Sequence, residues 1–270
     1  MVGLIIAPNN VSYLNSVLSL IAVALGAGAA GTLNMWYESD LDALMTRTCL
    51  RPIPTGQVTK NQALFFGVLL SIGSISLLYF SSNLMSASLL LLTICFYFFI
   101  YTVWLKRRTP QNIVIGGAAG ALPPVIGWTI ATGSLSIEPL ILFLIIFLWT
   151  PSHFWALSIY KSNDYKKAKI PMLPIIYGID KTKKNIFIYS LLMLPTISAP
   201  YLIGFLSEIF FYPASVLTIY YVYLCGTLLK IKKSKEINTL ARKIFLYSIF
   251  YLFMIFLLIL SDHFLIRFYG

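Results

Sequence analysis

Long apolar stretches recur along the whole chain, and they limit it to a fold built inside a lipid bilayer. Of the 270 residues, 59% are hydrophobic and only 11% are charged. About 20 consecutive apolar residues cross a hydrocarbon core of about 30 Å as a helix. By this criterion the sequence predicts eight full spans, at 13–33, 63–82, 85–105, 112–131, 138–159, 186–206, 210–229 and 244–262. We therefore expect an all-α, polytopic transmembrane helical bundle that forms a single integral-membrane domain over residues 1–270.

The N-terminal residues carry no recognisable targeting signal. Met1 to Ala7 is apolar but covers only about 10 Å as a helix, so it resembles the end of a span whose beginning is absent. The first basic residue is Arg47, which leaves no positively charged segment of the kind that opens a signal peptide, and no mitochondrial presequence is visible. Cys49, Cys95 and Cys225 show neither CxxC spacing nor a metal-ligand pattern, and we assign them no role.

Basic residues gather in alternate connectors between the predicted spans. The connectors 35–62, 106–111, 160–185 and 230–243 hold 19 of the 20 lysines and arginines, and Arg267 is the exception. The positive-inside rule places these four connectors in the cytoplasm or its organellar equivalent. The net charge of +11 is thus explained by topology, and we expect no nucleic-acid partner. For 230–243, topology alone is the preferred interpretation.

The first basic connector opens with oxygen-bearing side chains at four-residue spacing. Asn34, Glu38 and Asp42 would share one face of a helix, whereas Asp40 would point roughly the opposite way. Hard oxygen ligands suit Mg²⁺, which takes one or two protein carboxylates and completes its shell with water and phosphate. With no lysine or arginine before Arg47, we expect these acids to repel one another unless a cation lies between them. The alternative is a helix end with solvated charges at the lipid headgroups.

Three cations on the same predicted membrane face could bind the phosphate groups of a substrate. Arg47 and Arg51 lie four residues apart, and a guanidinium binds phosphate through two parallel hydrogen bonds. Lys106 ends the third predicted span. A substrate with a diphosphate group would therefore find its metal ion and its counter-charges at one membrane face.

A second polar cluster follows the fifth predicted span. Lys161, Asn163 and Asp164 are expected to close a helix, and the pair Pro171 and Pro174 to force an irregular loop after it. The two clusters lie about 125 residues apart in the sequence and in connectors that face the same side. They could share a diphosphate and its metal ions.

Two features inside the predicted bundle have structural and functional interpretations of similar weight. The pair Pro123 and Pro124 is expected to kink the fourth span, and small residues before it allow close helix packing or line a substrate cavity. His153 lies within the fifth span, where a polar ring requires a partner. It either contacts a substrate or only bonds to a neighbouring helix.

With these motifs assembled, the chain resembles the UbiA superfamily of membrane prenyltransferases, and within it the branch that farnesylates heme. Asn34, Glu38 and Asp42 are similar to the family's Asn-x-x-x-Asp-x-x-x-Asp motif. Three further stretches resemble the heme branch: ALMTRTCLRPIP, KRRTPQNIVIGGAAGALPPVIGW, and HFWAL followed by DY and PMLP. The resemblance extends from about Gly3 to the last predicted span.

The resemblance implies transfer of a farnesyl group from Mg²⁺-bound farnesyl diphosphate to a vinyl group of heme b, with addition of water, to give heme O and diphosphate. Heme b is a substrate here and not a cofactor. The implied catalytic residues are Asn34, Glu38, Asp42 and Asp164, of which Glu38, Asp42 and Asp164 bind the metal. The implied substrate-binding residues are Arg47, Arg51, Lys106, Lys161 and His153.

The chain departs from the family pattern at three places. Glu38 stands where the family commonly has Asp, and Asn163 stands where the heme branch usually has the first Asp of an Asp-Asp-Tyr. The family's first helix, with Lys-Pro-Arg near its start, is largely missing, so we expect a truncated chain or a misassigned start.

Two other functions are open at this stage. One is a UbiA-type aromatic prenyltransferase of quinone biosynthesis, and the other is a transporter or structural membrane protein. A transporter would place polar groups near the bilayer midplane, whereas here they gather at one face. For the heme enzyme we expect a bacterial plasma (inner) membrane location in preference to the mitochondrial inner membrane, active-site loops in the cytoplasm, and as a further partner a membrane enzyme that uses heme O.

Overall fold

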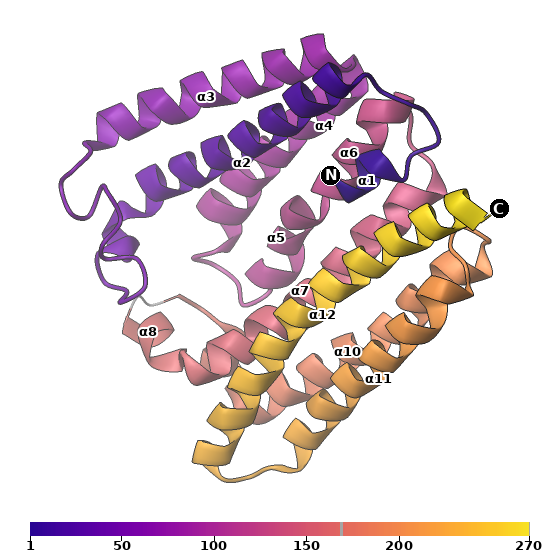
Figure 1. Cartoon of the computed structure of the whole chain (residues 1–270). Helices are drawn as coiled ribbons and strands as arrows, with labels where there is room; N and C mark the ends of the chain where they lie inside the picture. The colour runs from indigo at the N-terminus through magenta and orange to yellow at the C-terminus, as the bar shows by residue number, and fades with distance from the viewer. Residues whose placement is uncertain (168–169, 270) are drawn as a thin grey trace. The chain divides into compact units, whose positions relative to one another are not determined.

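The computed structural model describes residues 1–167 and 170–269, with their side chains except at positions 163, 268 and 269. Within these ranges the chain is helical and contains no strand (Figure 1). The elements are α1 (Val2–Ile5), α2 (Tyr13–Asp42), α3 (Lys60–Ser81), α4 (Leu84–Cys95), the π-helix η1 (Phe96–Leu105), α5 (Asn112–Ala121), α6 (Pro123–Thr132), α7 (Ile137–Tyr160), α8 (Ser162–Lys167), α9 (Leu173–Ile176), α10 (Gly178–Leu202), α11 (Glu208–Lys230) and α12 (Ser234–Tyr269).

Eight helical segments in the described ranges are long and apolar enough to cross a membrane, as the hydropathy pattern predicts. They are Tyr13–Asp42, Lys60–Ser81, Leu84–Leu105, Asn112–Thr132, Ile137–Tyr160, Gly178–Leu202, Glu208–Lys230 and Ser234–Arg267. The predicted all-α, multi-pass architecture is confirmed.

Several predicted boundaries are wrong, and most of the errors fall on the basic side of the spans. Helix α2 continues to Asp42 instead of ending at residue 33, α10 begins at Gly178 instead of 186, and α12 begins at Ser234 instead of 244. Hydropathy marks only the segment that matches the hydrocarbon core. The backbone ladder continues past that segment, because polar side chains are tolerated on a helix in the headgroup region.

The chain divides into two compact units. The first comprises Met1, Gly3–Leu135 and Asn163–Pro171, and the second comprises Val2, Ser136–Ser162 and Met172–Gly270. The predicted single domain over 1–270 stays a prediction.

In the first unit, α2 packs along α3 and η1, around a core that also includes α4 and α6. Buried residues of this core are Leu4, Ala22, Ala30, Leu33, Leu78, Leu90, Ile94, Phe98, Ile126 and Ile130. At one end of the helices, Asn83 donates to the Thr129 carbonyl at 2.8 Å. The hydroxyls of Ser19 on α2 and Ser81 on α3 form a hydrogen bond of 2.9 Å. These contacts satisfy polar groups for which the bilayer offers no water.

The predicted kink in the fourth span is confirmed. Helix α5 ends at Ala121 and α6 begins at Pro123, because two consecutive prolines lack the N–H groups that would continue the ladder. The N-terminal segment packs against this break. A Cβ atom on Gly3 would lie 2.1 Å from the Pro124 carbonyl oxygen, and one on Gly127 would lie 3.0 Å from the Leu4 nitrogen. Glycine is required for so close an approach.

The third span changes from an α-helix to a π-helix at Phe96. Its hydrogen bonds reach five residues back, so that the Lys106 N–H donates to the Tyr101 carbonyl at 2.9 Å. Gly116 makes room for the widened turn, because a Cβ there would lie 2.1 Å from the Tyr101 ring. Such helices are rare and concentrate at functional sites.

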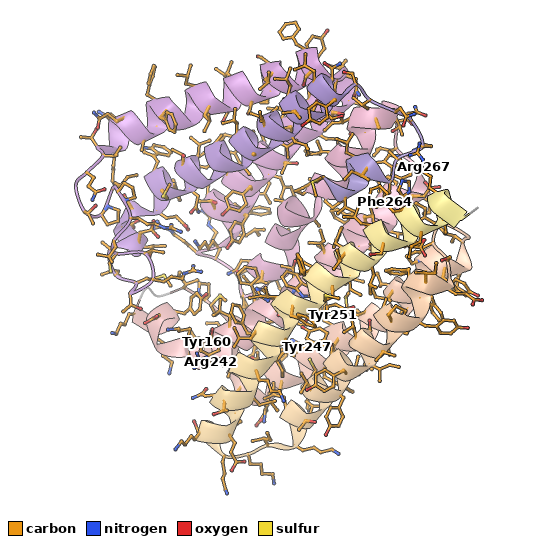
Figure 2. The ribbon with its side chains drawn as sticks, viewed as in Figure 1. Tyr160, Arg242, Tyr247, Tyr251, Phe264 and Arg267 are labelled. Carbon is orange, nitrogen blue, oxygen red and sulfur yellow. The ribbon has the colours of Figure 1, made fainter. Side chains whose placement is uncertain are left out.

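In the second unit, α7, α10, α11 and α12 pack on one another. Figure 2 shows Tyr247 and Tyr251 on α12. Tyr251 stacks on Tyr221 of α11 with ring centres 5.2 Å apart. The Tyr221 hydroxyl hydrogen bonds to Ser152 at 2.7 Å, and Tyr251 to Thr218 at 3.0 Å. The buried hydroxyls of both tyrosines therefore have partners.

Candidate active site

The end of α2 in the first unit brings three predicted site residues together on its buried face. Asn34, Glu38 and Asp42 are 5%, 0% and 4% exposed, whereas the Asp40 side chain is 56% exposed. The four-residue spacing is maintained because α2 remains helical through Asp42. The prediction that these three share a face and that Asp40 points away is confirmed.

Each buried carboxylate on this face is paired with a cation. Lys106, at the end of η1, forms an ion pair with Glu38, and Arg51 donates to Asp42 at 2.8 Å. The cations that these acids are expected to require are therefore supplied, at least in part, by the protein's own Lys106 and Arg51. The sequence near α2 holds no lysine or arginine before Arg47, but η1 brings Lys106 from 68 residues away.

Asn34 and Glu38 are also hydrogen-bonded to each other. The Asn34 Nδ2 atom donates to Glu38 Oε2 at 2.7 Å and to the Thr102 hydroxyl at 3.1 Å. Among the described residues, the buried Glu38 Oε1 atom accepts no hydrogen bond. A buried carboxylate oxygen without a partner is energetically costly. One oxygen of Glu38 is thus fixed by protein donors and the other is free to bind a cation.

Asp40 contributes to the structure on the opposite face of α2. Its two oxygens accept from Arg107 at 3.1 and 2.9 Å, and the Arg107 guanidinium lies 5.3 Å from the Tyr37 ring centre. The hydrogen bonds that Arg107 donates to the Asp40 carboxylate raise the pKa of Arg107. This pair ties α2 to the residue beside Lys106.

The loop after α2 carries the predicted arginines and folds back on the helix. The Thr48 hydroxyl donates to the Asp42 carbonyl at 3.0 Å. Arg51 is partly buried beside Asp42, whereas Arg47 is exposed. The structure therefore places Arg51 in the acidic cluster and leaves Arg47 at its surface.

Asp164 of the second polar cluster contacts this same loop. It accepts from the Thr46 hydroxyl at 2.8 Å. The prediction that Lys161, Asn163 and Asp164 close a helix is correct for Lys161, which caps the C-terminus of α7, and wrong for the other two, which lie in the short helix α8. Lys161 is exposed between the two helices, and the side chain of Asn163 lies outside the described part. Within that part, no three acidic, histidine or cysteine side chains are close enough to form a metal cluster.

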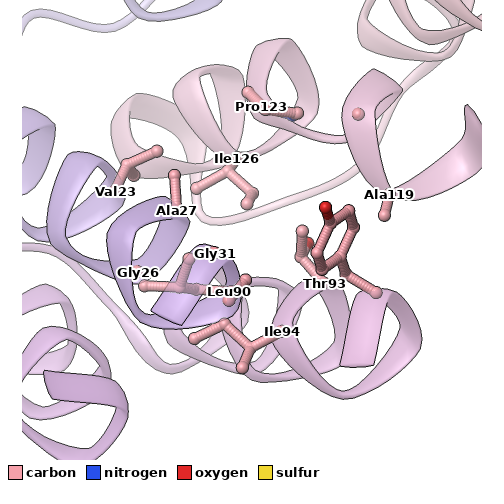
Figure 3. A pocket seen from close by; sticks show the side chains of 13 residues that line it. Val23, Gly26, Ala27, Gly31, Leu90, Thr93, Ile94, Ala119, Pro123 and Ile126 are labelled. Carbon is pink, nitrogen blue, oxygen red and sulfur yellow. The ribbon is translucent and has the colours of Figure 1, made fainter. Parts of the chain in front are cut away.

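An apolar cavity of about 290 Å³ lies in the first unit beside α2 (Figure 3). Its lining residues are Val23, Gly26, Ala27, Ala30, Gly31, Leu90, Thr93, Ile94, Tyr97, Ala119, Gly120, Pro123 and Ile126. Val23, Ala27 and Gly31 precede Asn34 on α2 at three- and four-residue spacing, so the cavity and the polar cluster share one helix face. Of the two interpretations of the small residues near Pro123, this supports a lining role for Gly120, whereas Gly116 accommodates Tyr101.

His153 lies in the second unit, on α7. Its ring is sandwiched between Trp149 and Phe245, with ring centres 4.2 and 4.6 Å away. Its Nδ1 atom lies 2.6 Å from the Ser248 hydroxyl. That hydroxyl has one proton, which it donates to the Phe245 carbonyl at 2.7 Å. Nδ1 must therefore carry the histidine proton, which leaves a lone pair on Nε2.

The predicted bond of His153 to a neighbouring helix is thus present, through Ser248 of α12. A contact with a substrate through Nε2 stays a prediction.

Sequence reasoning missed the residues that support the cluster. Thr102 is fully buried against Asn34, Thr46 holds Asp164, and the buried Asn112 donates to the Lys106 carbonyl at 3.3 Å. Threonine and asparagine are common at helix ends, so nothing in the sequence marks them. Only the packing of helices from distant segments identifies them.

Comparison with known proteins agrees with this architecture. Residues 1–259 match the UbiA prenyltransferase family. The chain is 64% identical over 261 residues to a protoheme IX farnesyltransferase of Pelagibacter ubique, covering 97% of this chain and 86% of that protein. It is 50% identical over 262 residues to a protoheme IX farnesyltransferase of Ehrlichia ruminantium, covering 97% and 88%.

Two solved structures show the same fold at low sequence identity. A digeranylgeranylglyceryl phosphate synthase superposes with a TM-score of 0.81 at 20% identity, covering 97% of this chain and 90% of that one. A UbiA homologue from Archaeoglobus fulgidus, bound to DMAPP and Mg²⁺, superposes with a TM-score of 0.63 at 16% identity, covering 90% and 88%. Because residues 1–259 of its 270 residues match the family model, this chain belongs to the UbiA prenyltransferase family.

Proposed function

We propose that this protein transfers the farnesyl group of farnesyl diphosphate to a vinyl group of heme b, with addition of water, to give heme O and diphosphate. The observation that carries the proposal is the 64% identity, over 97% of the chain, to a relative named protoheme IX farnesyltransferase. The quinone alternative is disfavoured, because the most similar relatives compared share that name.

The residues at the end of α2 fit a magnesium ion. Glu38 Oε1 is a buried carboxylate oxygen without a hydrogen bond from any described residue, and Asp42 supplies a second carboxylate one turn away on the same face. Mg²⁺ prefers such oxygen ligands, with water and substrate phosphate completing its shell. Glu38 and Asp42 would hold it, whereas metal binding by Asp164, which contacts Thr46 and, among the described residues, forms no three-acid cluster with them, stays a prediction. The ion would supply positive charge opposite the departing diphosphate.

Lys106 and Arg51 supply the protein's own positive charge to the same place. Each already contacts a carboxylate of the cluster, so each lies within reach of an anion bound there. Arg47, exposed on the same loop, and Lys161 are the other cations that we assign to the diphosphate. Fixed cations in a site shielded from water stabilise the charge that develops on a leaving group.

The reaction then follows from the bonds that change. The C1–O bond of farnesyl diphosphate breaks, and its electron pair leaves with the diphosphate. The π electrons of the heme vinyl group form the new C–C bond to the allylic cation. Water adds to the carbocation on the former vinyl group and loses a proton. The apolar cavity beside α2, of about 290 Å³, suits the isoprenoid chain and excludes water that would hydrolyse the cation.

The location that we propose is the bacterial plasma membrane, with the basic connectors in the cytoplasm. In the first unit, the loop after α2 and the end of η1 both place a cation against the carboxylates of α2, which agrees with one basic side. A membrane enzyme that uses heme O is the further partner that we predict.

The proposal is tested with purified protein in lipid nanodiscs that receives farnesyl diphosphate, Mg²⁺ and either heme b or 4-hydroxybenzoate. We expect heme O, identified by chromatography and mass, and no prenylated benzoate. Chelation of the metal should stop the reaction, and added Mg²⁺ should restore it. Prenylation of the benzoate without any heme O would contradict the proposal in favour of the quinone-type enzyme.

A further inference from the structure

The orientation of the Asn34 amide is determined by a chain of hydrogen bonds that begins in the π-helix. The Thr102 hydroxyl is fully buried and donates its single proton to the Tyr97 carbonyl at 3.0 Å. It can therefore only accept in its second contact, 3.1 Å from Asn34 Nδ2. The other proton of Nδ2 goes to Glu38 Oε2 at 2.7 Å. Both donors of the Asn34 amide are thus committed to protein acceptors.

The amide oxygen is left for another use. Asn34 Oδ1 takes no part in either of these hydrogen bonds, and Glu38 Oε1, one turn along α2, accepts no hydrogen bond from any described residue. With the amide reversed, Oδ1 would face the Glu38 carboxylate and the Thr102 oxygen, whose proton is already donated to Tyr97, and these acceptors would repel one another. Thr102 and Glu38 therefore together favour the orientation in which Asn34 Oδ1 and Glu38 Oε1 are available as hard ligands.

The π-helix makes this contact possible. Thr102 reaches the carbonyl five residues before it. In the regular helix just upstream, the Thr93 hydroxyl bonds to the Leu89 carbonyl four residues before it, at 2.7 Å. The five-residue ladder continues to Lys106, whose side chain pairs with Glu38. One widened segment thus presents both Thr102 and Lys106 to the buried face of α2.

We propose that Thr102 is a positioning residue of the active site, which holds the Asn34 amide so that Oδ1, together with Glu38 Oε1, ligates the metal ion of the metal–diphosphate complex. This inference rests on the proposed function. Thr102 acts through Asn34 and does not contact the substrate. Residues that orient a metal ligand typically affect metal affinity by about 10- to 100-fold.

The test uses the full-length protein in nanodiscs, with Mn²⁺ as a paramagnetic probe and a non-reactive thio analogue of farnesyl diphosphate. Thr102→Val keeps the side-chain shape and removes the hydroxyl, and we expect it to weaken Mn²⁺ binding by about 10- to 100-fold. Thr102→Ser keeps the hydroxyl and should bind as the parent does. The matched control is Thr196→Val, because Thr196 is a buried threonine whose hydroxyl donates to the Leu192 carbonyl of its own helix. It should have no effect.

A double-mutant cycle separates positioning from a general structural effect. In an Asn34→Ala background, Thr102→Val should cause no further loss of Mn²⁺ affinity, because the residue through which it acts is gone. An equal loss in both backgrounds, or parent-like affinity of Thr102→Val, would overturn the inference. Thr102→Ala serves as the second variant if the valine variant does not fold.

The outcomes also distinguish this inference from the proposed function. A parent protein that makes heme O while Thr102→Val retains its Mn²⁺ affinity overturns only the positioning role. A parent that binds neither Mn²⁺ nor the analogue overturns both.

Discussion

Arg51 has one contact within the protein and a second, proposed contact with the substrate. It holds Asp42 at 2.8 Å, and we assign it to the diphosphate. Arg51→Lys retains the charge and loses the planar fork, so one of two parallel hydrogen bonds to a phosphate is lost. We expect the KM for farnesyl diphosphate to rise about tenfold and kcat to change less than KM does. Steady-state kinetics at saturating heme measure this.

Arg47→Lys is the companion variant, since Arg47 is exposed on the same loop. If both lysine variants bind farnesyl diphosphate as tightly as the parent, the two arginines act only as topology signals.

His153 is the residue for which a heme contact can be tested separately from diphosphate chemistry. Its Nδ1 proton is fixed by Ser248, which leaves Nε2 with a lone pair. His153→Ala should shift the Soret band or weaken the binding of added heme, and it should leave the binding of the farnesyl diphosphate analogue intact. Ser248→Ala should cause the same change in a weaker form. Unchanged heme spectra and affinity in both variants would remove His153 from the site.

At the level of elements, the cavity beside α2 depends on the small side chains of that helix, which leave space unfilled. Gly31 lines the cavity, and a Cβ placed on it would meet no atom within 4 Å. Gly31→Leu should therefore fill part of the space meant for the isoprenoid chain. A pocket distinguishes a single methylene by about 10- to 200-fold, so we expect the kcat/KM for farnesyl diphosphate to fall about tenfold or more.

For geranyl diphosphate, which is one isoprene unit shorter, the kcat/KM of the Gly31→Leu variant should fall less than it does for farnesyl diphosphate. Gly73→Leu is the control, because Gly73 is equally unobstructed but lies on the exposed face of α3. An equal loss in the two leucine variants, or an equal loss with both substrates, would show that the cavity does not hold the chain.

The elements also show how far the sequence can predict the site. The face shared by Asn34, Glu38 and Asp42 follows from spacing within one helix, so it was predictable. The pairing of Glu38 with Lys106 was not predictable, because it depends on where the π-helix η1 directs the residue that follows it, 68 residues after Glu38. Hydropathy does not distinguish a π-helix from an α-helix.

At the scale of the whole molecule, the number and order of the spans could be predicted, because crossing a bilayer requires about 20 apolar residues. The ends of the helices could not be predicted in this way, because polar extensions such as residues 34–42 of α2 are not apolar enough to be detected by hydropathy. The break at Pro123 was predictable because proline chemistry is local. The contact of Gly3 with Pro124 was not, because it joins residues far apart in the sequence.

The predicted topology can be checked with single cysteines in a variant without Cys49, Cys95 and Cys225. Lys60→Cys lies in a basic connector and Ser134→Cys in a connector without lysine or arginine, and both positions are exposed. In bacterial spheroplasts, a membrane-impermeant maleimide should label position 134 at once and position 60 only after lysis. The reverse pattern would invert the orientation.

The central claim is that the buried face of α2 forms the catalytic centre, and the most direct measurement compares Glu38→Gln with Asp40→Asn. Both remove one charge from the same helix, but Glu38 is fully buried and Asp40 faces outward in a pair with Arg107. We predict that Glu38→Gln lowers kcat/KM for Mg²⁺-dependent heme O formation by about 100-fold or more. Asp40→Asn should stay within about fivefold of the parent, because an exposed pair contributes about 1 kcal/mol or less. Equal losses in the two variants would contradict the account.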